Sequence, residues 1–153
     1  MQGKGEEIGK VLDRLRRQCS RREYCSSDIL RKASEVLDEE AASEVLRVLV
    51  EERYVDDLRY ASAFARDKSS IAGWGEVKIR YMLSAKGVAK KVIDEALQEI
   101  DRPKADMRLE KLLENKWKTL KNDPQGKLKL IRFALGRGYG YEDVSSYIKG
   151  MGI

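Results

Sequence analysis

The sequence predicts an all-α fold: three tandem three-helix repeats that form an elongated, curved array. Apolar residues recur at the three-to-four-residue spacing of helices, and no alternation of apolar and polar residues is long enough to indicate a strand. A helical segment that ends in a basic residue followed by glycine occurs twice. From these observations we expect units at residues 1–57, 58–102 and 103–153.

The two clear repeats align on Gly87 and Gly138. The matching segments are Lys78-Ile79-x-x-Met82-Leu83-x-x-Lys86-Gly87-Val88 and Lys129-Leu130-x-x-Phe133-Ala134-x-x-Arg137-Gly138-Tyr139. In both, a cation in the last turn precedes a glycine, as is typical where a helix ends. We expect longer helices before these segments, over residues 58–71 and 107–120, and short amphipathic helices after them, over residues 92–100 and 144–148.

Helix starts are predicted at acidic residues and prolines. Asp101 is expected to cap a helix that has Pro103 in its first turn. Asp123-Pro124 is expected to form the N-cap and first residue of the next helix. Either residue of Asp56-Asp57 can cap the helix that follows it.

A weaker third copy of the repeat runs from Val11 to Val55. It has a middle helix around residues 29–32, which residues 26–28 can cap, and a last helix over residues 42–54. It has no glycine at the turn between them. The alternative is one compact bundle in which the similarity arose by chance.

The composition excludes several kinds of chemistry. The chain has no histidine, so a Ser-His-Asp triad, a Cys-His pair, an H-E-x-x-H site and a two-Cys two-His finger are all impossible. Cys19 and Cys25 cannot build a zinc site alone, and we expect two reduced thiols. No apolar stretch approaches the ~18 residues of a membrane span, and the N-terminal segment lacks the apolar region of a signal peptide. We expect a soluble cytoplasmic protein with no metal and no cofactor.

Two glycine-rich segments and two tryptophans are candidates for ligand sites. Gly73-Trp74-Gly75 and Gly136-Arg137-Gly138-Tyr139-Gly140 resemble phosphate-binding loops only superficially, because no strand precedes them and no Gly-Lys-Ser/Thr follows. We expect both segments to break helices. Trp74 and Trp117 could stack on bases, but tryptophan at helical spacing indicates a core position more often.

Charge is distributed unevenly along the chain. The net charge of +5 results from 31 basic and 26 acidic residues. Residues 35–57 carry nine acidic and two basic side chains, whereas the segments on both sides are net positive. The acidic residues could in principle hold Mg²⁺, but helix capping and a solvated or partner-facing surface are the expected roles; they are Asp38, Glu39, Glu40, Glu51, Glu52, Asp56 and Asp57.

Basic blocks attract polyanions, of which the phosphate backbone of nucleic acids is the commonest. The predicted partner-binding residues are Arg66, Lys68, Lys78, Arg80, Lys86, Lys116, Lys118, Lys121, Lys127, Arg132 and Arg137. If the repeats form a concave face, these side chains could line it and hold either phosphate groups or an acidic protein surface. The alternative is that the charges only solvate helix surfaces.

Three segments together resemble the RecX regulatory family. Leu49-Val50-Glu51-Glu52-Arg53-Tyr54-Val55-Asp56-Asp57-Leu58-Arg59-Tyr60-Ala61 is similar to that family's junction L-x-E-x-G-Y-L-D-D-x-R-F-A. Trp74-Gly75 with Lys78-Ile79 and Lys86-Gly87-Val88, and then Arg137-Gly138-Tyr139-Gly140-Tyr141-Glu142-Asp143-Val144, resemble the later segments. Two departures are Arg53, where glycine is common, and Ser34-Glu35-Val36-Leu37, which stands where the family usually has a lysine-glycine turn.

The resemblance implies three tandem three-helix units without catalysis. It implies a protein that lies in the groove of the RecA filament on single-stranded DNA and inhibits strand exchange and ATP hydrolysis by RecA. We expect this protein to be a monomer. The resemblance also implies roles in DNA recombination, DNA repair and the SOS response. Contacts with single-stranded DNA would be made to the backbone.

Two other interpretations were considered. A DNA-binding module could act without RecA, with one unit used as a helix-turn-helix reader, but the middle helices offer mostly Lys and Arg, which favours backbone contact over base reading. A small nuclease could use carboxylates with Mg²⁺, but the sequence has no clear convergent acidic motif.

Overall fold

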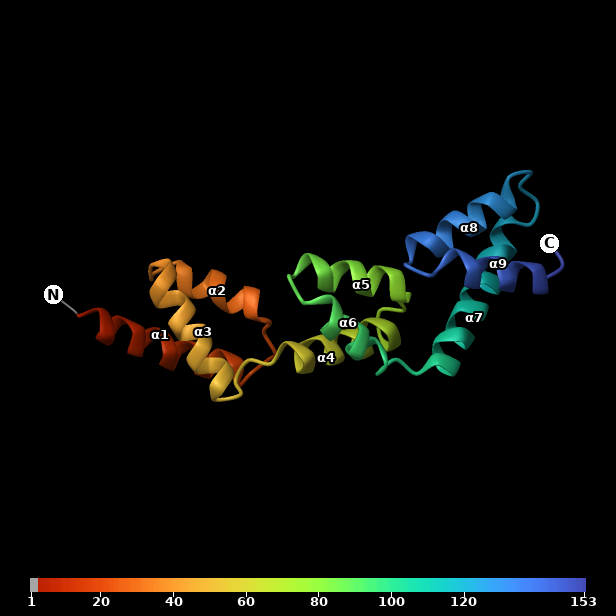
Figure 1. Ribbon diagram of the computed structural model, residues 1–153. Helices are drawn as coiled ribbons and strands as arrows, with labels where there is room; N and C mark the ends of the chain where they lie inside the picture. Colours follow the sequence, from red (N-terminus) through yellow and green to blue (C-terminus); the bar gives the residue numbers. More distant parts are fainter. Residues whose placement is uncertain (1–2) are drawn as a thin grey trace. The chain divides into compact units, whose positions relative to one another are not determined.

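The computed structural model describes residues 3–153, and over this range it contains nine α-helices and no strand (Figure 1). The helices are α1 (Lys4–Cys19), α2 (Ser26–Ser34), α3 (Glu39–Glu51), α4 (Asp57–Ser70), α5 (Glu76–Ala85), α6 (Lys90–Leu97), α7 (Arg102–Leu120), α8 (Gly126–Gly136) and α9 (Tyr141–Gly150). The predicted all-α class is confirmed, and the helices follow one another in threes.

Two compact units make up the chain. The first contains the chain up to Ser62 together with Leu83–Ala96, and the second contains Ala63–Met82 together with Leu97–Ile153. The division runs through α4 and α5, so the middle three helices contribute to both units. The repeat boundaries expected from the sequence lie at the starts of α4 and α7. These boundaries and the elongated, curved shape remain predictions.

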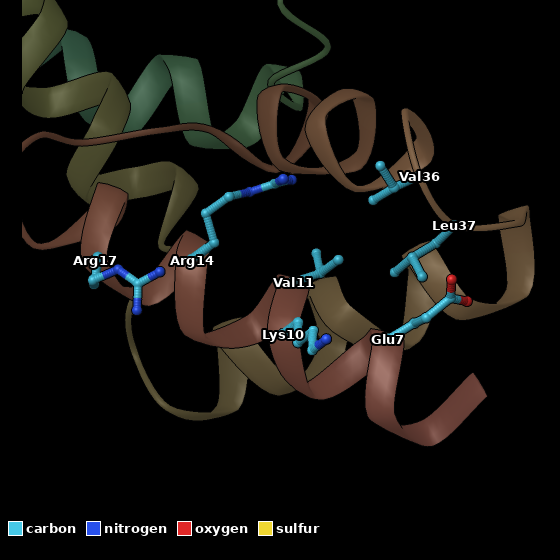
Figure 2. A pocket seen from close by; sticks show the side chains of 7 residues that line it. All are labelled: Glu7, Lys10, Val11, Arg14, Arg17, Val36 and Leu37. Atoms are coloured by element: carbon cyan, nitrogen blue, oxygen red, sulfur yellow. The ribbon is translucent and has the colours of Figure 1, made fainter. Parts of the chain in front are cut away.

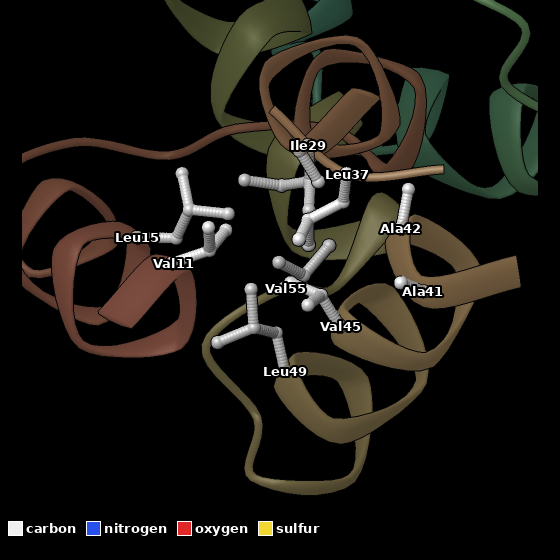
Figure 3. Close-up of a cluster of buried hydrophobic side chains, with 10 residues drawn as sticks. Val11, Leu15, Ile29, Leu37, Ala41, Ala42, Val45, Leu49 and Val55 are labelled. Carbon is white, nitrogen blue, oxygen red and sulfur yellow. The ribbon is translucent and has the colours of Figure 1, made fainter. Parts of the chain in front are cut away.

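The core of the first unit lies between α1, α2 and α3. Figure 3 shows Leu15 of α1, Ile29 of α2, and Val45 and Leu49 of α3 pointing toward one another. All four side chains are fully buried. Val45 and Leu49 lie four residues apart and therefore on one face of α3. Asp38 caps the same helix by accepting a backbone hydrogen bond from the first turn at 2.8 Å.

The core of the second unit lies between the last three helices. Leu109 and Leu113 of α7, Leu130 of α8, and Val144 and Ile148 of α9 are buried together. The four-residue spacing within α7 and within α9 places each pair on one helix face. The helical periodicity of the sequence therefore marked true core positions.

Two of the predicted helix starts are confirmed. Asp101 caps α7, because its carboxylate accepts a hydrogen bond from the amide of Lys104 at 3.1 Å, and Pro103 lies in the first turn. Asp56 has the same role for α4, where its carboxylate accepts from the amide of Arg59 at 3.0 Å.

The predicted start of α8 is wrong. This helix begins at Gly126, with Gln125 as its N-cap. The Asp123 carboxylate accepts from the amide of Gln125, and its carbonyl accepts from the amide of Gly126, both at 2.8 Å. Asp123-Pro124 is therefore part of a turn. The packing explains the shift, because a Cβ on Gly126 would lie 2.2 Å from the carbonyl oxygen of Leu120, so the helix starts at the residue that allows this approach.

Among the residues with left-handed backbone conformation that follow helices, three end α3, α5 and α8 in the same type of turn. These residues are Arg53 after α3, with φ 63°, Gly87 after α5, with φ 78°, and Gly138 after α8, with φ 91°. In each case the next amide donates to the carbonyl five residues earlier, the bond of a Schellman turn. The two lysine/arginine-glycine helix ends are thus confirmed. Arg53 adopts the same conformation without being glycine.

The start of α2 contacts later parts of the first unit, and we call this contact the α2 junction. The amide of Ser26 donates to the Asp57 carboxylate at 2.7 Å. The Ser27 hydroxyl donates to the carbonyl of Lys86 at 2.6 Å. The Asp28 side chain is only 6% exposed and lies 2.9 Å from the ammonium group of Lys86. The residues that were expected to cap α2 are instead its first helical residues.

The α2 junction contains a buried carboxylate. Burial by itself would raise the pKa of Asp28, but hydrogen bonds from Lys86 and Cys25 outweigh this, and the pKa lies below its ordinary value. The hydrogen bond to Asp28 also raises the pKa of Lys86. The pair is therefore fully charged at neutral pH.

Candidate nucleic-acid interface

In the second unit, the connection between α4 and α5 lies against the connection between α8 and α9. We call this contact, between residues 73–78 and 137–139, the α5 junction. The amide of Gly75 donates to the carbonyl of Arg137 at 2.8 Å, and the amide of Val77 donates to the carbonyl of Gly138 at 2.9 Å. The two connections therefore meet backbone to backbone.

Glycine is required on both sides of the α5 junction. A Cβ on Gly75 would lie 2.4 Å from the backbone of Gly138, and a Cβ on Gly138 would lie 2.2 Å from the Cβ of Lys78. The two glycine-rich segments thus have a structural role in which backbones approach closely. This contact brings Trp74 and Arg137, which are 63 positions apart in the sequence, into one region.

Two lysines converge on Trp74. The ammonium groups of Lys78 and Lys68 lie 4.3 and 4.7 Å from the centre of the indole ring. Phe64 supports the ring from one edge, with the two ring centres 6.1 Å apart. Such cation–π contacts hold the ammonium groups in place without neutralising them. No acidic side chain among residues 3–153 pairs with either lysine.

A second cation–aromatic cluster surrounds Phe133 of α8. The ammonium group of Lys116 lies 4.8 Å from the ring centre, and the guanidinium group of Arg137 lies 5.3 Å from it. Lys116 comes from α7 and Arg137 from the end of α8. The cations of the two clusters therefore come from four segments of the second unit: α4, α5, α7 and the end of α8.

A hollow of about 250 Å³ lies beside the α5 junction. Its lining residues are Gly73, Arg108, Lys111, Leu112, Asn115, Arg137 and Tyr139. The Arg108 guanidinium group donates to the hydroxyl of buried Ser69 at 3.0 Å, whereas its Nε is buried without a hydrogen-bond partner among the described residues. Three cations thus border one hollow, where they could bind an anionic group.

Tyr139 forms one wall of this hollow. Its hydroxyl donates to the carbonyl of Gly73 at 3.1 Å. Burial raises the pKa of Tyr139, and the charges of Arg108 and Arg137 act in the opposite direction. The phenol therefore stays neutral at physiological pH, and its hydrogen bond to Gly73 links the two connections.

We call the combined surface the aromatic-basic face. Its members are Lys68, Trp74, Lys78, Arg108, Lys111, Lys116, Phe133 and Arg137. Cations that lack acidic partners bind phosphate groups, and half-buried aromatic rings offer an edge to bases or sugars. The arrangement of cations around aromatic rings is therefore suited to binding an anionic polymer.

The structure brings together four of the eleven basic residues predicted from the sequence: Lys68, Lys78, Lys116 and Arg137. Three others have local partners. Arg66 lies 3.8 Å from Glu99, Arg80 lies 3.7 Å from Glu76, and Lys86 belongs to the α2 junction of the first unit. The remaining four are exposed and lie outside the clusters described here: Lys118, Lys121, Lys127 and Arg132.

Sequence reasoning missed Arg108 entirely. It lies in the middle of α7 with acidic residues nearby in the sequence, and no motif distinguishes it from a solvated helix cation. Only the folded structure shows that Arg108 lines the hollow and also contacts Ser69 of α4. Of the two tryptophans, Trp117 packs against the core of the second unit, as expected, and Trp74 is half-buried between Phe64 and the lysines.

The acidic residues of the first unit form caps and ion pairs. Glu52 binds Arg16 at 2.6 Å, and Glu51 binds Arg47 at 2.7 Å. Residues 3–153 contain no group of three or more carboxylates or cysteines that could hold a metal ion. Cys19 is free, as is Cys25. None of the helices in this range is long and apolar enough to cross a membrane.

Comparisons with known proteins agree with this architecture. Residues 56–97 match the family model described as RecX, second three-helix domain, and residues 106–148 match RecX, third three-helix domain. A regulatory protein RecX from Vibrio parahaemolyticus is 38% identical, over 74% of this chain and 71% of the relative. This chain belongs to the RecX family. A RecX relative from Clostridium botulinum strain Alaska E43 is also 38% identical, over 73% of this chain and 54% of the relative.

Solved RecX structures share the fold. A crystal structure of RecX from Lactobacillus salivarius superimposes with a TM-score of 0.85 at 19% identity, over 95% of this chain and 97% of that one. Another crystal structure, of a regulatory protein RecX, gives a TM-score of 0.86 at 22% identity, over 95% of this chain and 73% of that one. Tandem helical repeats are therefore the RecX architecture here as well. The chain spans about half the length of the clostridial relatives that it matches.

Proposed function

We propose that this RecX-family protein binds the RecA–single-stranded DNA filament in its groove and inhibits the recombinase and ATPase activities of RecA. The observation that carries the proposal is the aromatic-basic face. Six of its eight members are cations, and two aromatic rings hold four of these cations in place. Such a surface is suited to a nucleoprotein polymer that presents phosphate groups at regular intervals.

The proposal includes binding without reading sequence. Lys and Arg dominate the face, and the hollow offers only one amide side chain, Asn115. Phosphate contacts position a protein on nucleic acid but carry no base information. We therefore expect affinity for single-stranded DNA to fall steeply with salt and to depend little on base sequence.

In this proposal the protein is a cytoplasmic, monomeric regulator and not an enzyme. Its effect on RecA would come from occupying the groove or from favouring disassembly of the filament. In this way the protein would act in DNA recombination, DNA repair and the SOS response.

A second candidate function is a sequence-independent DNA-binding module that acts without RecA. The same cations and rings support it, since single-stranded nucleic acid can bind to such a surface by itself. The two functions differ in stoichiometry. A filament regulator inhibits RecA when it is scarce relative to DNA, whereas a DNA competitor inhibits only as it covers the DNA.

The test is DNA-dependent ATP hydrolysis by RecA, measured with substoichiometric amounts of this protein. Inhibition at low occupancy of the DNA supports the filament regulator. The double variant Lys78→Glu/Lys116→Glu should weaken inhibition by about tenfold or more, because it reverses one cation in each cluster.

Lys118→Glu/Lys121→Glu is the matched control, since it changes the net charge equally but lies outside the aromatic-basic face. Helicity should be unchanged in both variants by circular dichroism. Equal loss of inhibition in the two variants would contradict a specific role of the aromatic-basic face. Inhibition only when the DNA is saturated with this protein would favour the second function.

A further inference from the structure

The first unit contains a hollow of about 330 Å³ between α1 and the connection that joins α2 to α3 (Figure 2). The lining residues are Glu7, Lys10, Val11, Arg14, Arg17, Val36 and Leu37. Figure 2 shows Val11 pointing into the hollow from α1, with Val36 and Leu37 on the opposite wall. Val11 and Leu37 are buried, whereas Val36 is 56% exposed and offers apolar surface beside the hollow.

Three cations border this hollow from one stripe of α1. Lys10, Arg14 and Arg17 follow the spacing i, i+4, i+7, which places them on one face of a helix. None of the acidic residues within 3–153 forms an ion pair with them. By contrast, Arg16 on the neighbouring face binds Glu52 through two hydrogen bonds, of 2.6 and 2.8 Å.

Arg14 shows that the stripe lacks an internal partner. Its side chain extends from α1 along the hollow (Figure 2), and its Nε is shielded from solvent with no hydrogen-bond partner among the described residues. A buried guanidinium N–H that has no acceptor costs free energy.

The chemistry of the walls distinguishes between two kinds of anionic partner. The floor is aliphatic and contains no aromatic ring, so bases have nothing to stack on, unlike at Trp74 and Phe133 of the aromatic-basic face. An aliphatic floor beside a row of cations is complementary to a peptide with one or more Leu, Ile or Val residues flanked by carboxylates.

We propose that this hollow docks an acidic, aliphatic segment of a partner protein. An aliphatic side chain of the segment packs on Val11, Val36 and Leu37. Its carboxylates bind the cationic side chains of Lys10, Arg14 and Arg17. Glu7, at the N-terminal end of the hollow, repels further carboxylates and so limits the acidic part of the segment to the side of Arg17.

This inference rests on the proposed function in one respect, since the partner of stated chemistry would be a protein of the filament. The docking itself needs neither DNA nor RecA. The two units would then bind different partners: the second unit would bind nucleic acid, and the first would bind a protein.

The test uses the full chain and a fluorescein-labelled amphipathic peptide of about four helical turns. In this peptide Leu recurs at i, i+3 and i+4, and Asp and Glu occupy the other positions. Binding is followed by fluorescence anisotropy without RecA. We expect saturable binding that weakens with salt, and we expect little binding of a control peptide in which every Leu is replaced by Ser.

The decisive variants are Lys10→Glu/Arg17→Glu and Val36→Ser. The first should weaken peptide binding by about tenfold or more, and the second by about threefold, because exposed positions change the surface without disturbing the core. Lys91→Glu/Lys149→Glu, with the same change in net charge on exposed helix positions outside the hollow, should bind the peptide as the wild type does. Circular dichroism should show equal helicity in all variants.

Several outcomes would overturn the docking site. They are equal peptide binding by Lys10→Glu/Arg17→Glu and the wild type, equal binding of the Ser control peptide, or loss of short oligothymidylate binding instead of peptide binding in this variant. The last result would assign the hollow to nucleic acid. Loss of the proposed RecA regulation with peptide binding intact would contradict the proposed function alone.

Discussion

The α2 and α5 junctions occupy corresponding places in the repeat, but different chemistry holds each of them. In both, the start of a middle helix contacts the turn that ends the middle helix of the next three. At the α2 junction, side chains make the contacts: the Ser27 hydroxyl and the buried Asp28 carboxylate both bind Lys86. At the α5 junction, Gly75 and Gly138 allow the backbones themselves to meet.

The difference shows that corresponding positions of the repeat make a contact in both cases, although the residues and the type of interaction differ. A side-chain contact tolerates variation in spacing but depends on charge. A backbone contact does not depend on charge, but it excludes every side chain larger than a hydrogen atom. We therefore expect the two junctions to respond differently to the same substitution, to charge removal and to pH.

The largest effect is expected from adding a methyl group at the turn of each junction. Gly138→Ala should destabilise the second unit by about 3 kcal/mol, because the left-handed backbone disfavours alanine and the new Cβ would overlap Lys78. Gly87→Ala should cost about 1 kcal/mol, because its Cβ would meet only Ser27 at 3.9 Å and the backbone conformation alone is strained. Urea unfolding followed by circular dichroism measures both, and equal costs would contradict the backbone contact.

A smaller effect is expected from removing one charge at each junction. Asp28→Asn should destabilise the first unit by about 2 kcal/mol, since it leaves Lys86 beside a buried amide. Glu76→Gln at the α5 junction should cost about 0.5 kcal/mol or less, because Glu76 pairs with exposed Arg102 and Arg80. Hydrogen exchange of residues 26–34 and 76–85 shows where each variant loses stability. A larger loss of stability in Glu76→Gln than in Asp28→Asn would contradict the conclusion that only the α2 junction depends on charge.

A stabilising substitution is predicted at the third left-handed turn. Arg53→Gly should stabilise the first unit by about 1 kcal/mol, because glycine adopts φ 63° without the steric cost that arginine has. Arg53→Ala is the control, and it should leave stability nearly unchanged. A loss of stability in Arg53→Gly would mean that a contact of the arginine side chain stabilises the unit by more than the left-handed backbone destabilises it. Thermal unfolding measures the sign.

The smallest effect is a pH dependence confined to the α2 junction. The folded-state pKa of Asp28 is lower than its unfolded value, so its contribution to stability is complete above the unfolded pKa of about 3.9 and is lost as the pH falls through the folded value. At pH 4 the folded carboxyl is still mostly ionised, so the loss between pH 7 and pH 4 should be smaller than that caused by Asp28→Asn. Asp28→Asn should lack this component of the acid sensitivity. If the free energy of unfolding of Asp28→Asn depended on pH as that of the wild type does, the assignment to Asp28 would be contradicted.

Periodicity and capping rules predicted most of the fold. Apolar spacing located the helices, and the glycines after Lys86 and Arg137 marked true helix ends. The start of α8 was misjudged because a proline rule could not show how closely Gly126 approaches the end of α7. The left-handed Arg53 was visible only as a departure from a family pattern.

The candidate site was less predictable than the fold. Charge counts predicted Lys116, Lys118 and Lys121 among eleven partner-binding cations, and of these three only Lys116 lies beside an aromatic ring on the aromatic-basic face. Contacts between distant segments decide which cations converge, as at Trp74, and such contacts are not visible in local sequence. Arg108 was missed for that reason, and the stripe of Lys10, Arg14 and Arg17 was counted only as part of a basic N-terminal segment.

The hydrogen bond from Ser26 to Asp57 has a practical consequence for dissecting the protein. The first amide of α2 is satisfied by a carboxylate that belongs to α4, and the neighbouring Asp28 depends on Lys86. A fragment cut after the third helix would lose both partners at once. An N-terminal fragment that retains both partners and also reaches the end of the first compact unit extends to Ala96, so expression boundaries should follow these side chains and not the count of helices.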